Sequence, residues 1–381
     1  MRVPGPKFSH LALLLAVTLL TPAWLAARSQ GSQQLNSASA PTSVADLRQI
    51  LAHPRHQSDA KVARQLASLA LGERMNEATL QALQSRLPGP RSRSALVALA
   101  DASAFLPPPP AEILEQPPPD AARRSHMLSL TVDYLHNVIP KLPDFYADET
   151  VVRYEDRPRH KSKASSSGDH PSWRQLAVSN LIVSYRNGKE VVHPRGWVTM
   201  PLNGKIEGLV TTGTFGPILS TVIVDAAHGV TTWKRWEHGS RGPIAVYEYR
   251  VAQNHSHYSI GQYGAASPAA VAGQPTAYHG EIAVDPATGV IWRLILEADP
   301  PFGSPIFQSN IMVRYAPVQI GGKTYVCPLR SVSMGELSLD PERLASGAPS
   351  ARWLSDTTFA NYHLFRSEMQ ILTGDPSPQH R

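Results

Sequence analysis

The repeat of apolar residues changes near Asp148 from a helical spacing to a two-residue alternation, and this change constrains the fold most. Ten strand-like runs follow between Thr150 and Leu372. Asn187-Gly188 and Gly321-Gly322 each separate two such runs, the spacing of a type I′ hairpin, and Asp285–Gly289 suits a five-residue hairpin loop. Hairpins join antiparallel neighbours. The sequence therefore predicts an α+β fold with a large curved antiparallel sheet, half-barrel-like, instead of a parallel α/β sheet.

Helical spacing marks the N-terminal third and one later segment. Residues 44–106 carry four short apolar stripes preceded by capping residues, which predicts a small helical region. A longer stripe predicts a helix from about Ala121 to Val138, at the start of the β-rich domain. Apolar residues, an early proline and a following glycine also predict a helix over Pro217–His228. We expect one or two of these helices to pack on the sheet.

The first 27 residues have the three-part pattern of a secretory signal peptide. Arg2 and Lys7 precede the aliphatic run Leu11–Leu20, and Ala26-Ala27 offers small residues for cleavage. The run is short for a bilayer span, and no later run is long enough, so no integral span is expected after cleavage. This predicts a periplasmic or secreted protein.

The remaining boundaries follow from composition. Four and three consecutive prolines within residues 107–120 predict a semi-rigid, proline-rich linker, with a peptide ligand for a partner as the alternative. The predicted organisation is a signal peptide (1–27), a disordered linker (28–43), a helical region (44–106), the proline-rich linker (107–120), a β-rich domain with an N-terminal helix (121–373) and a disordered tail (374–381).

Charge and cysteine content exclude several classes of protein. Removal of residues 1–27 would lower the net charge only from +6 to +4, a mild excess, so nucleic acid is not an expected partner. The densest basic run, within residues 157–163, lies beside Ser165–Gly168, which favours a solvated loop, with contact to an anionic surface as the alternative. A single cysteine, Cys327, excludes an intrachain disulfide, and its strand-like surroundings predict a buried side chain. No cofactor is predicted, because neither a phosphate-binding loop nor a dinucleotide fingerprint occurs.

Catalytic and metal signals are sparse. His255 and His257 would project from one face of a strand, but spacing marks no further zinc ligand, so the metal prediction is none. Glu281 and Glu297, with His279, could supply acid–base chemistry, although alternate strand positions that face water explain these carboxylates better. The sequence therefore does not assign an enzyme activity, and the predicted catalytic set is none.

Aromatic and aliphatic residues supply the candidate ligand site. Trp233 and Trp236 should point to opposite faces of their strand. Core packing is the default interpretation of such residues, and lining a cavity for an apolar ligand is the alternative. The predicted ligand-binding residues are Phe215, Ile218, Val222, Tyr247, Tyr249 and Trp292.

Several stretches resemble a group of uncharacterised secreted proteins from acidobacteria, a resemblance that implies no activity. They are Ala95–Leu106, Leu130–Phe145, Phe215–Gly229, Tyr278–Asp299 and Ile320–Ser333. The order of a helix, antiparallel strands and a further helix is similar to the lipoprotein-carrier (Lol-type) half-barrel fold. That similarity implies an apolar concavity for acyl chains.

Three functions remain open from the sequence. The first is an exported, non-enzymatic binding protein that holds a lipid, a lipoprotein acyl chain or another apolar ligand in a β half-barrel. The second is a secreted hydrolase with a carboxylate and histidine site. The third is an envelope protein–protein interaction module, in which the helical region docks an envelope protein.

Overall fold

The structure, a computed structural model, describes residues 41–52, 57–137, 141–156, 172–194, 217–260, 274–339 and 350–365. The predicted signal peptide, most of the segment 28–43, the tail 374–381 and Phe215 lie outside these residues, so those predictions stay predictions. Within the described part, no helix combines the length and the apolar character that crossing a bilayer requires.

Six α-helices occur among the described residues, and capping residues start several of them. Ser43 and Asn76 accept hydrogen bonds from backbone N–H groups of the first turns of α1 and α3, and Pro90 occupies the first turn of α4. The predicted helix Pro217–His228 is confirmed. The helices are α1 (Val44–Ile50), α2 (Asp59–Ala67), α3 (Glu77–Gln84), α4 (Pro90–Ala102), α5 (Ala121–Asn137) and α6 (Pro217–His228).

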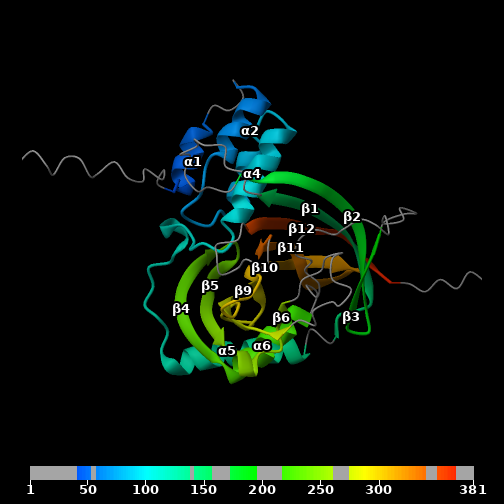
Figure 1. The fold of residues 1–381 in the computed structure, drawn as a ribbon. Helices are drawn as coiled ribbons and strands as arrows, with labels where there is room; N and C mark the ends of the chain where they lie inside the picture. The colour runs from blue at the N-terminus through cyan, green and yellow to red at the C-terminus, as the bar shows by residue number, and fades with distance from the viewer. Residues whose placement is uncertain are drawn as a thin grey trace, which may run out of the picture. The chain divides into compact units, whose positions relative to one another are not determined.

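Ten strands form one antiparallel sheet in the order β3-β2-β1-β12-β11-β10-β9-β8-β5-β4. Among the described residues the end strands β3 and β4 do not pair with each other, so the sheet is open, and Figure 1 shows its curvature. This confirms the predicted α+β class. The strands of this sheet and of the short β6-β7 pair are β1 (Phe145–Asp156), β2 (Arg174–Arg186), β3 (Lys189–Pro194), β4 (Val230–Gly239), β5 (Gly242–Val251), β6 (Ser259–Ile260), β7 (Gln274–Pro275), β8 (Ala277–Val284), β9 (Ile291–Asp299), β10 (Ile306–Ile320), β11 (Lys323–Ser338) and β12 (Ser350–Leu364).

The predicted hairpin turns are confirmed by their backbone angles. Asn187 and Gly188 have φ values of 51° and 75°, and Gly321 and Gly322 have 58° and 82°. Two successive positive φ angles define the type I′ turn, whose twist matches that of the flanking strands. Local sequence therefore fixes the pairing of β2 with β3 and of β10 with β11.

One side-chain direction differs from the prediction. The pairing of β4 with β5 shifts between Trp233 and Arg235, which marks an extra residue in β4. The two indole rings therefore meet on the same side, 4.8 Å apart and edge to face. The expectation that Trp233 and Trp236 point to opposite faces is wrong, because an irregular strand does not keep the two-residue period.

The two faces of the sheet carry different helices. We call the face that carries α5 and α6 the inner face and the face that carries α4 the outer face. On the outer face, Ala98 of α4 and the following Ala104 pack against strand residues that include Met312 and Leu354. A separate apolar cluster, with Leu47, Leu66 and Leu96 among its members, holds α1–α4 together.

Buried ion pairs also join the helical region to the outer face. Arg330 of β11 contacts Glu77, Asp101 and Asp356 at 2.9, 2.6 and 2.7 Å. A second group lies nearer β4, where Glu237 pairs with Arg74 at 3.3 Å. The helical region is thus attached through both apolar and charged contacts.

The proline-rich segment lies along β4. The Leu114 N–H donates to the Trp236 carbonyl at 3.1 Å, and the Trp236 indole N–H donates to the Pro117 carbonyl at 3.2 Å. Its prolines cannot donate backbone hydrogen bonds, so pairing is confined to isolated positions. The domain boundary placed in this segment stays a prediction.

Candidate functional site

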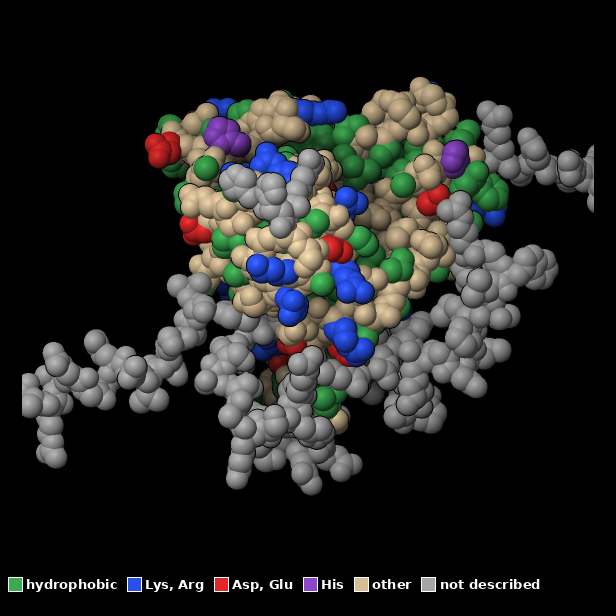
Figure 2. All heavy atoms as spheres, turned by 90° about the horizontal axis from the view of Figure 1, so that it is seen from above, with side chains coloured by type: hydrophobic (Ala, Val, Ile, Leu, Met, Phe, Trp, Pro, Cys, Tyr) green, Lys and Arg blue, Asp and Glu red, His purple; other side chains and the backbone are tan. Residues whose placement is uncertain are grey.

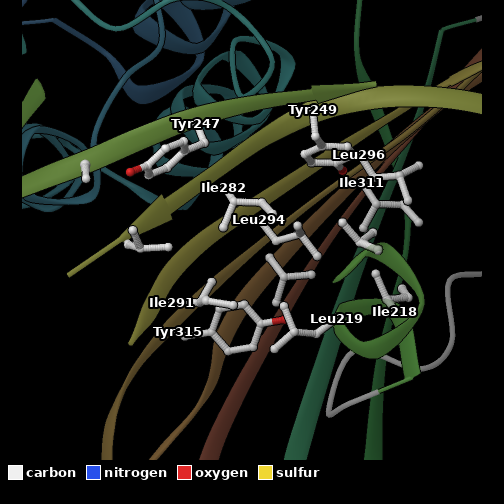
Figure 3. Close-up of a cluster of buried hydrophobic side chains, with 14 of the residues drawn as sticks. Ile218, Leu219, Tyr247, Tyr249, Ile282, Ile291, Leu294, Leu296, Ile311 and Tyr315 are labelled. Carbon is white, nitrogen blue, oxygen red and sulfur yellow. The ribbon is translucent and has the colours of Figure 1, made fainter. Parts of the chain in front are cut away.

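The inner face between β4 and β10 is an apolar surface built from alternate strand residues. Tyr247 and Tyr249 of β5 share this face because they lie two positions apart. Figure 3 shows both rings with aliphatic side chains of β8, β9 and β10. The buried members of this cluster are Met127, Ile218, Leu219, Val222, Trp236, Ala245, Tyr247, Tyr249, Val251, Tyr278, Ile282, Val284, Ile291, Leu294, Leu296, Ile311, Val313 and Tyr315.

Helix α6 covers part of this surface with one side only. Ile218, Leu219 and Val222 are buried in the cluster, whereas Val224 is 54% exposed. Residues spaced by three or four positions share a helix face, so the burial pattern follows from the sequence. Figure 3 shows Leu219 of α6 beside Tyr315 of β10. An apolar helix face thus lies directly against the apolar sheet.

Asp225 fixes α6 through polar contacts near its C-terminal end. This fully buried carboxylate accepts hydrogen bonds from the Tyr278 hydroxyl and the His257 backbone N–H, both at 2.8 Å. The His257 Nδ1 lies 2.5 Å from the other carboxylate oxygen. Burial, followed by the Asp225 contact, raises the pKa of Tyr278, so that tyrosine remains a donor at neutral pH. Such contacts hold a buried carboxylate without a covalent link.

The predicted histidine pair does not act as a unit. His257 contacts Asp225, whereas the His255 ring stacks on His228 with 6.3 Å between centroids. Across the part of the chain that is described, no group of three side chains is placed to hold a metal ion.

Beyond β10, the middle of the inner face becomes polar, next to a second apolar cluster that includes Phe145, Ala147 and Phe359. Strand register places Ser331 opposite Thr357, and Thr357 opposite Val151 of β1. The next row joins Ser333, Ser355 and Arg153. Residues opposite each other in register share a face, so the four hydroxyl side chains form one stripe across β11 and β12. We call Ser331, Ser333, Ser355 and Thr357 the hydroxyl stripe.

Three buried polar atoms around this stripe have no hydrogen-bond partner. They are the Glu149 Oε2, the Tyr315 hydroxyl and the Trp353 indole nitrogen. Burial, with a smaller contribution from Glu190, raises the pKa of Glu149 to about 7. Arg153 lies on the same side of β1 as Glu149, and burial lowers its pKa. Buried polar groups without partners are rare, and they indicate a place where water or a ligand completes the structure.

The acidic residues considered for catalysis lie on the outer face. Burial alone would raise the pKa of Glu281, but contacts with Arg235 at 2.8 and 2.9 Å outweigh burial and lower it to about 2. Glu297 accepts a hydrogen bond from Asn310 at 3.1 Å, and His279 contacts Asp299 at the same distance. Glu281 is therefore ionised at neutral pH and bound to arginine, which is unlike a general acid.

Four of the six predicted ligand-binding residues come together. Ile218, Val222, Tyr247 and Tyr249 belong to the inner-face cluster, and their role in binding stays a prediction. Trp292 instead lines a charged cleft of about 460 Å³, where Arg241 lies 5.8 Å from its ring.

Sequence reasoning missed Asp225, Glu149 and Arg153. Asp225 could have been found as a charged residue within the apolar stripe of α6. An acid and a base four positions apart in one strand signal the other two.

The surface of the helical region is strongly basic. Figure 2 shows Lys and Arg side chains gathered on the face seen from above. Exposed basic side chains come from α1, α2, α4 and the end of α3. Among the described residues of α1–α4 and their connections, Asp46 is the one acidic residue that is exposed. The exposed basic residues are Arg48, Lys61, Arg64, Arg86, Arg91 and Arg93.

Comparison with known proteins adds one likeness. No protein-family model matches the chain, and no curated protein matches it. Among solved structures, a LolA superfamily protein from Nitrosomonas europaea aligns with 64% of this chain and 93% of its own length. The identity is 12% and the TM-score is 0.27. A superposition of this quality assigns no function to the chain.

Proposed function

We propose that the chain is an exported, non-enzymatic binding protein that holds a lipid or another apolar ligand on the inner face of its sheet. One observation supports this proposal above the others. An open sheet presents a continuous aromatic and aliphatic surface, and α6 covers it with a matching apolar side. The export part of the proposal rests on residues 1–27.

In this proposal α6 is a cover whose apolar side an acyl chain can replace. Ile218, Leu219 and Val222 contribute roughly 5–9 kcal/mol of transfer free energy together, at about 1.5–3 kcal/mol for each buried aliphatic side chain. An acyl chain buries a similar amount over about ten methylenes, at about 0.8 kcal/mol each. Exchange of helix for ligand is therefore nearly balanced, as reversible binding requires.

The polar contacts of Asp225 give this cover a pivot. His257 and Tyr278 hold the C-terminal end of α6, so the end near Ile218 is the one that moves. Because these contacts lie at the C-terminal end of α6, they can persist while Ile218 and Leu219 separate from the sheet. The ligand then lies between Leu219 and the aromatic side chains of β5 and β10.

A fluorescence experiment tests the proposal. Val224 is exposed on α6, so Val224→Cys accepts an environment-sensitive maleimide dye, and the buried Cys327 does not compete for it. Ala82→Cys on the exposed side of α3 is the matched control. Palmitate should shift the emission of the Val224→Cys conjugate and leave the Ala82→Cys conjugate unchanged.

Two further measurements complete this test. Native mass spectrometry of the mature protein from its own envelope should show a bound lipid. The delipidated protein should bind N-phenyl-1-naphthylamine and release it to palmitate. If the protein carries no lipid, and neither probe nor palmitate binds at micromolar concentrations, the proposed function is wrong.

The basic surface of the helical region favours a second role, docking on an anionic surface. Arg64, Arg91 and Arg93 are exposed and lie on neighbouring helices α2 and α4. Anionic phosphatidylglycerol vesicles should sediment the protein at low salt and release it at ~1 M salt, where screening acts over about 3 Å. Equal binding to neutral phosphatidylcholine vesicles would remove this second role.

A further inference from the structure

Two opposite charges lie on the inner face of β1, away from α6. Glu149 and Arg153 are four residues apart, so their side chains leave the strand on the same side. At about 3.3 Å per residue their Cα atoms are about 13 Å apart. Val151 lies between them and is buried. This part of the sheet thus offers an acidic and a basic group on one strand, with an apolar residue between them.

Neither group is satisfied within the described structure. The Glu149 Oε2 is buried and accepts no hydrogen bond there. Arg153 forms no ion pair with any carboxylate in the described ranges, and Glu149 is the charge that acts on it. Partly desolvated charges that no hydrogen bond or ion pair satisfies are costly, and a ligand with complementary charges lowers that cost.

Hydrogen-bonding groups lie on the strands beside these two charges. The hydroxyl stripe crosses β11 and β12 in the two rows that contain Val151 and Arg153. Tyr315 is 8% exposed, and its hydroxyl has no hydrogen-bond partner among the described residues. The Trp353 indole N–H is also buried and has no acceptor within the described ranges. Two unsatisfied donors and several hydroxyls suit an oxygen-rich anion, whereas Glu149 suits a cation.

This polar area adjoins the apolar cluster. Tyr315 belongs to the cluster, and Figure 3 shows its hydroxyl end directed toward Leu219. A molecule with a polar head on β1, β11 and β12 can therefore extend its chain toward the surface that α6 covers.

We propose that the inner face binds an amphipathic lipid with a zwitterionic head, holding an ammonium group at Glu149 and a phosphate group at Arg153 and the hydroxyl stripe. This inference rests on the proposed function and specifies its ligand. Glu190 of β3 adds negative charge on the ammonium side, since it raises the pKa of Glu149. A purely anionic head would leave Glu149 without a partner, and a purely cationic head would leave Arg153 without one.

Displacement of N-phenyl-1-naphthylamine from the mature, delipidated chain measures the preference. The competitors are lysophosphatidylethanolamine, lysophosphatidylglycerol, palmitate and hexadecylamine, which share a sixteen-carbon chain. Lysophosphatidylethanolamine should compete at least tenfold more tightly than each of the others, a difference of about 1.4 kcal/mol. Equal competition by all four would reject the head-group site and leave the apolar site intact.

Two variants assign the groups. Glu149→Gln should weaken lysophosphatidylethanolamine about tenfold and leave lysophosphatidylglycerol within twofold. Arg153→Gln should weaken both phospholipids and spare hexadecylamine. Glu248→Gln is the control, because Glu248 is a half-exposed carboxylate on the outer face, paired with Lys234. Binding of the fluorescent probe itself, which has no charged head, verifies that each variant is folded.

The outcomes separate the two proposals. Absence of probe binding in the unmodified chain contradicts the proposed function. If the probe binds normally and the Glu149→Gln variant keeps its full preference for lysophosphatidylethanolamine, the head-group site is wrong, whereas the proposed function is not contradicted.

Discussion

Replacement of Arg330 by methionine tests how the helical region is held on the sheet. The guanidinium group contacts three carboxylates, those of Glu77 from α3, Asp101 from α4 and Asp356 from β12. Its side chain is 11% exposed and that of Asp101 is 2% exposed. Methionine keeps most of the volume and removes every charged contact. The variant therefore isolates the electrostatic part of the attachment.

The expected loss is about 3–5 kcal/mol in the free energy of unfolding, the cost of leaving buried charges without their partner. Burial and the proximity of Asp356 raise the pKa of Asp101, and Arg330 opposes this shift. Without Arg330 the pKa of both aspartates rises further. A carboxylate with a raised pKa in the folded state destabilises the protein as pH rises above its unfolded value of 3.8. The loss should therefore be largest at pH 8 and smaller at pH 5.

Urea denaturation with two probes measures this effect. Four of the five tryptophans in the described ranges, Trp233, Trp236, Trp292 and Trp353, lie on strands of the sheet. After removal of residues 1–27, fluorescence therefore reports mainly the sheet, whereas circular dichroism at 222 nm is sensitive to the helices. The two transitions should coincide in the unmodified protein. In the Arg330→Met variant, the helical signal should be lost at lower urea.

Arg352→Met is the matched control. Arg352 lies on the adjacent strand and pairs with Glu336 at 3.2 Å, but its side chain is 33% exposed. A pair of this kind contributes about 0–1 kcal/mol. If Arg330→Met costs no more than this control, or if its cost does not fall at low pH, the reasoning about buried charge is refuted.

Three further outcomes follow from single residues. Gly280→Ala should cost at least about 1–3 kcal/mol by urea denaturation, because a Cβ there would collide with the Ile295 carbonyl oxygen, and an unchanged midpoint would contradict this packing. Cys327 is buried, which raises its pKa to about 12, so Ellman's reagent should modify it only after unfolding; rapid reaction in buffer would show that it is accessible. The raised pKa of Glu149 means that folded protein binds more protons than unfolded protein between about pH 4.5 and 7, so stability should fall as pH rises through this window. Glu149→Gln should flatten that part of the profile, and an identical slope in the variant would refute the assignment.

The local parts of the fold were predictable because short-range physics determines them. Two successive residues that tolerate positive φ, such as Asn187-Gly188, are enough to specify a hairpin. The apolar spacing and the flanking Pro217 and Gly229 were enough to specify α6. The antiparallel class followed directly from the hairpins.

The candidate site was predictable only in part. Tyr247 and Tyr249 share a face because they lie two residues apart in a regular strand. The same reasoning was wrong for Trp233 and Trp236, because the extra residue in β4 interrupts the alternation of side chains between the two faces. Trp292 lines a charged cleft away from the apolar cluster, since its place depends on a register shift between β8 and β9.

The sequence by itself determined where the helices and strands form, which strands join as hairpins and which helix is apolar on one side. Those properties depend on residues within a few positions of each other. Only the tertiary structure decided that Asp225 meets Tyr278, that Arg330 meets Asp101, and that Glu149 remains without a partner. These residues are separated by many positions in the chain. Their meeting depends on strand order and sheet curvature, which emerge when all strands pair and the two faces are covered.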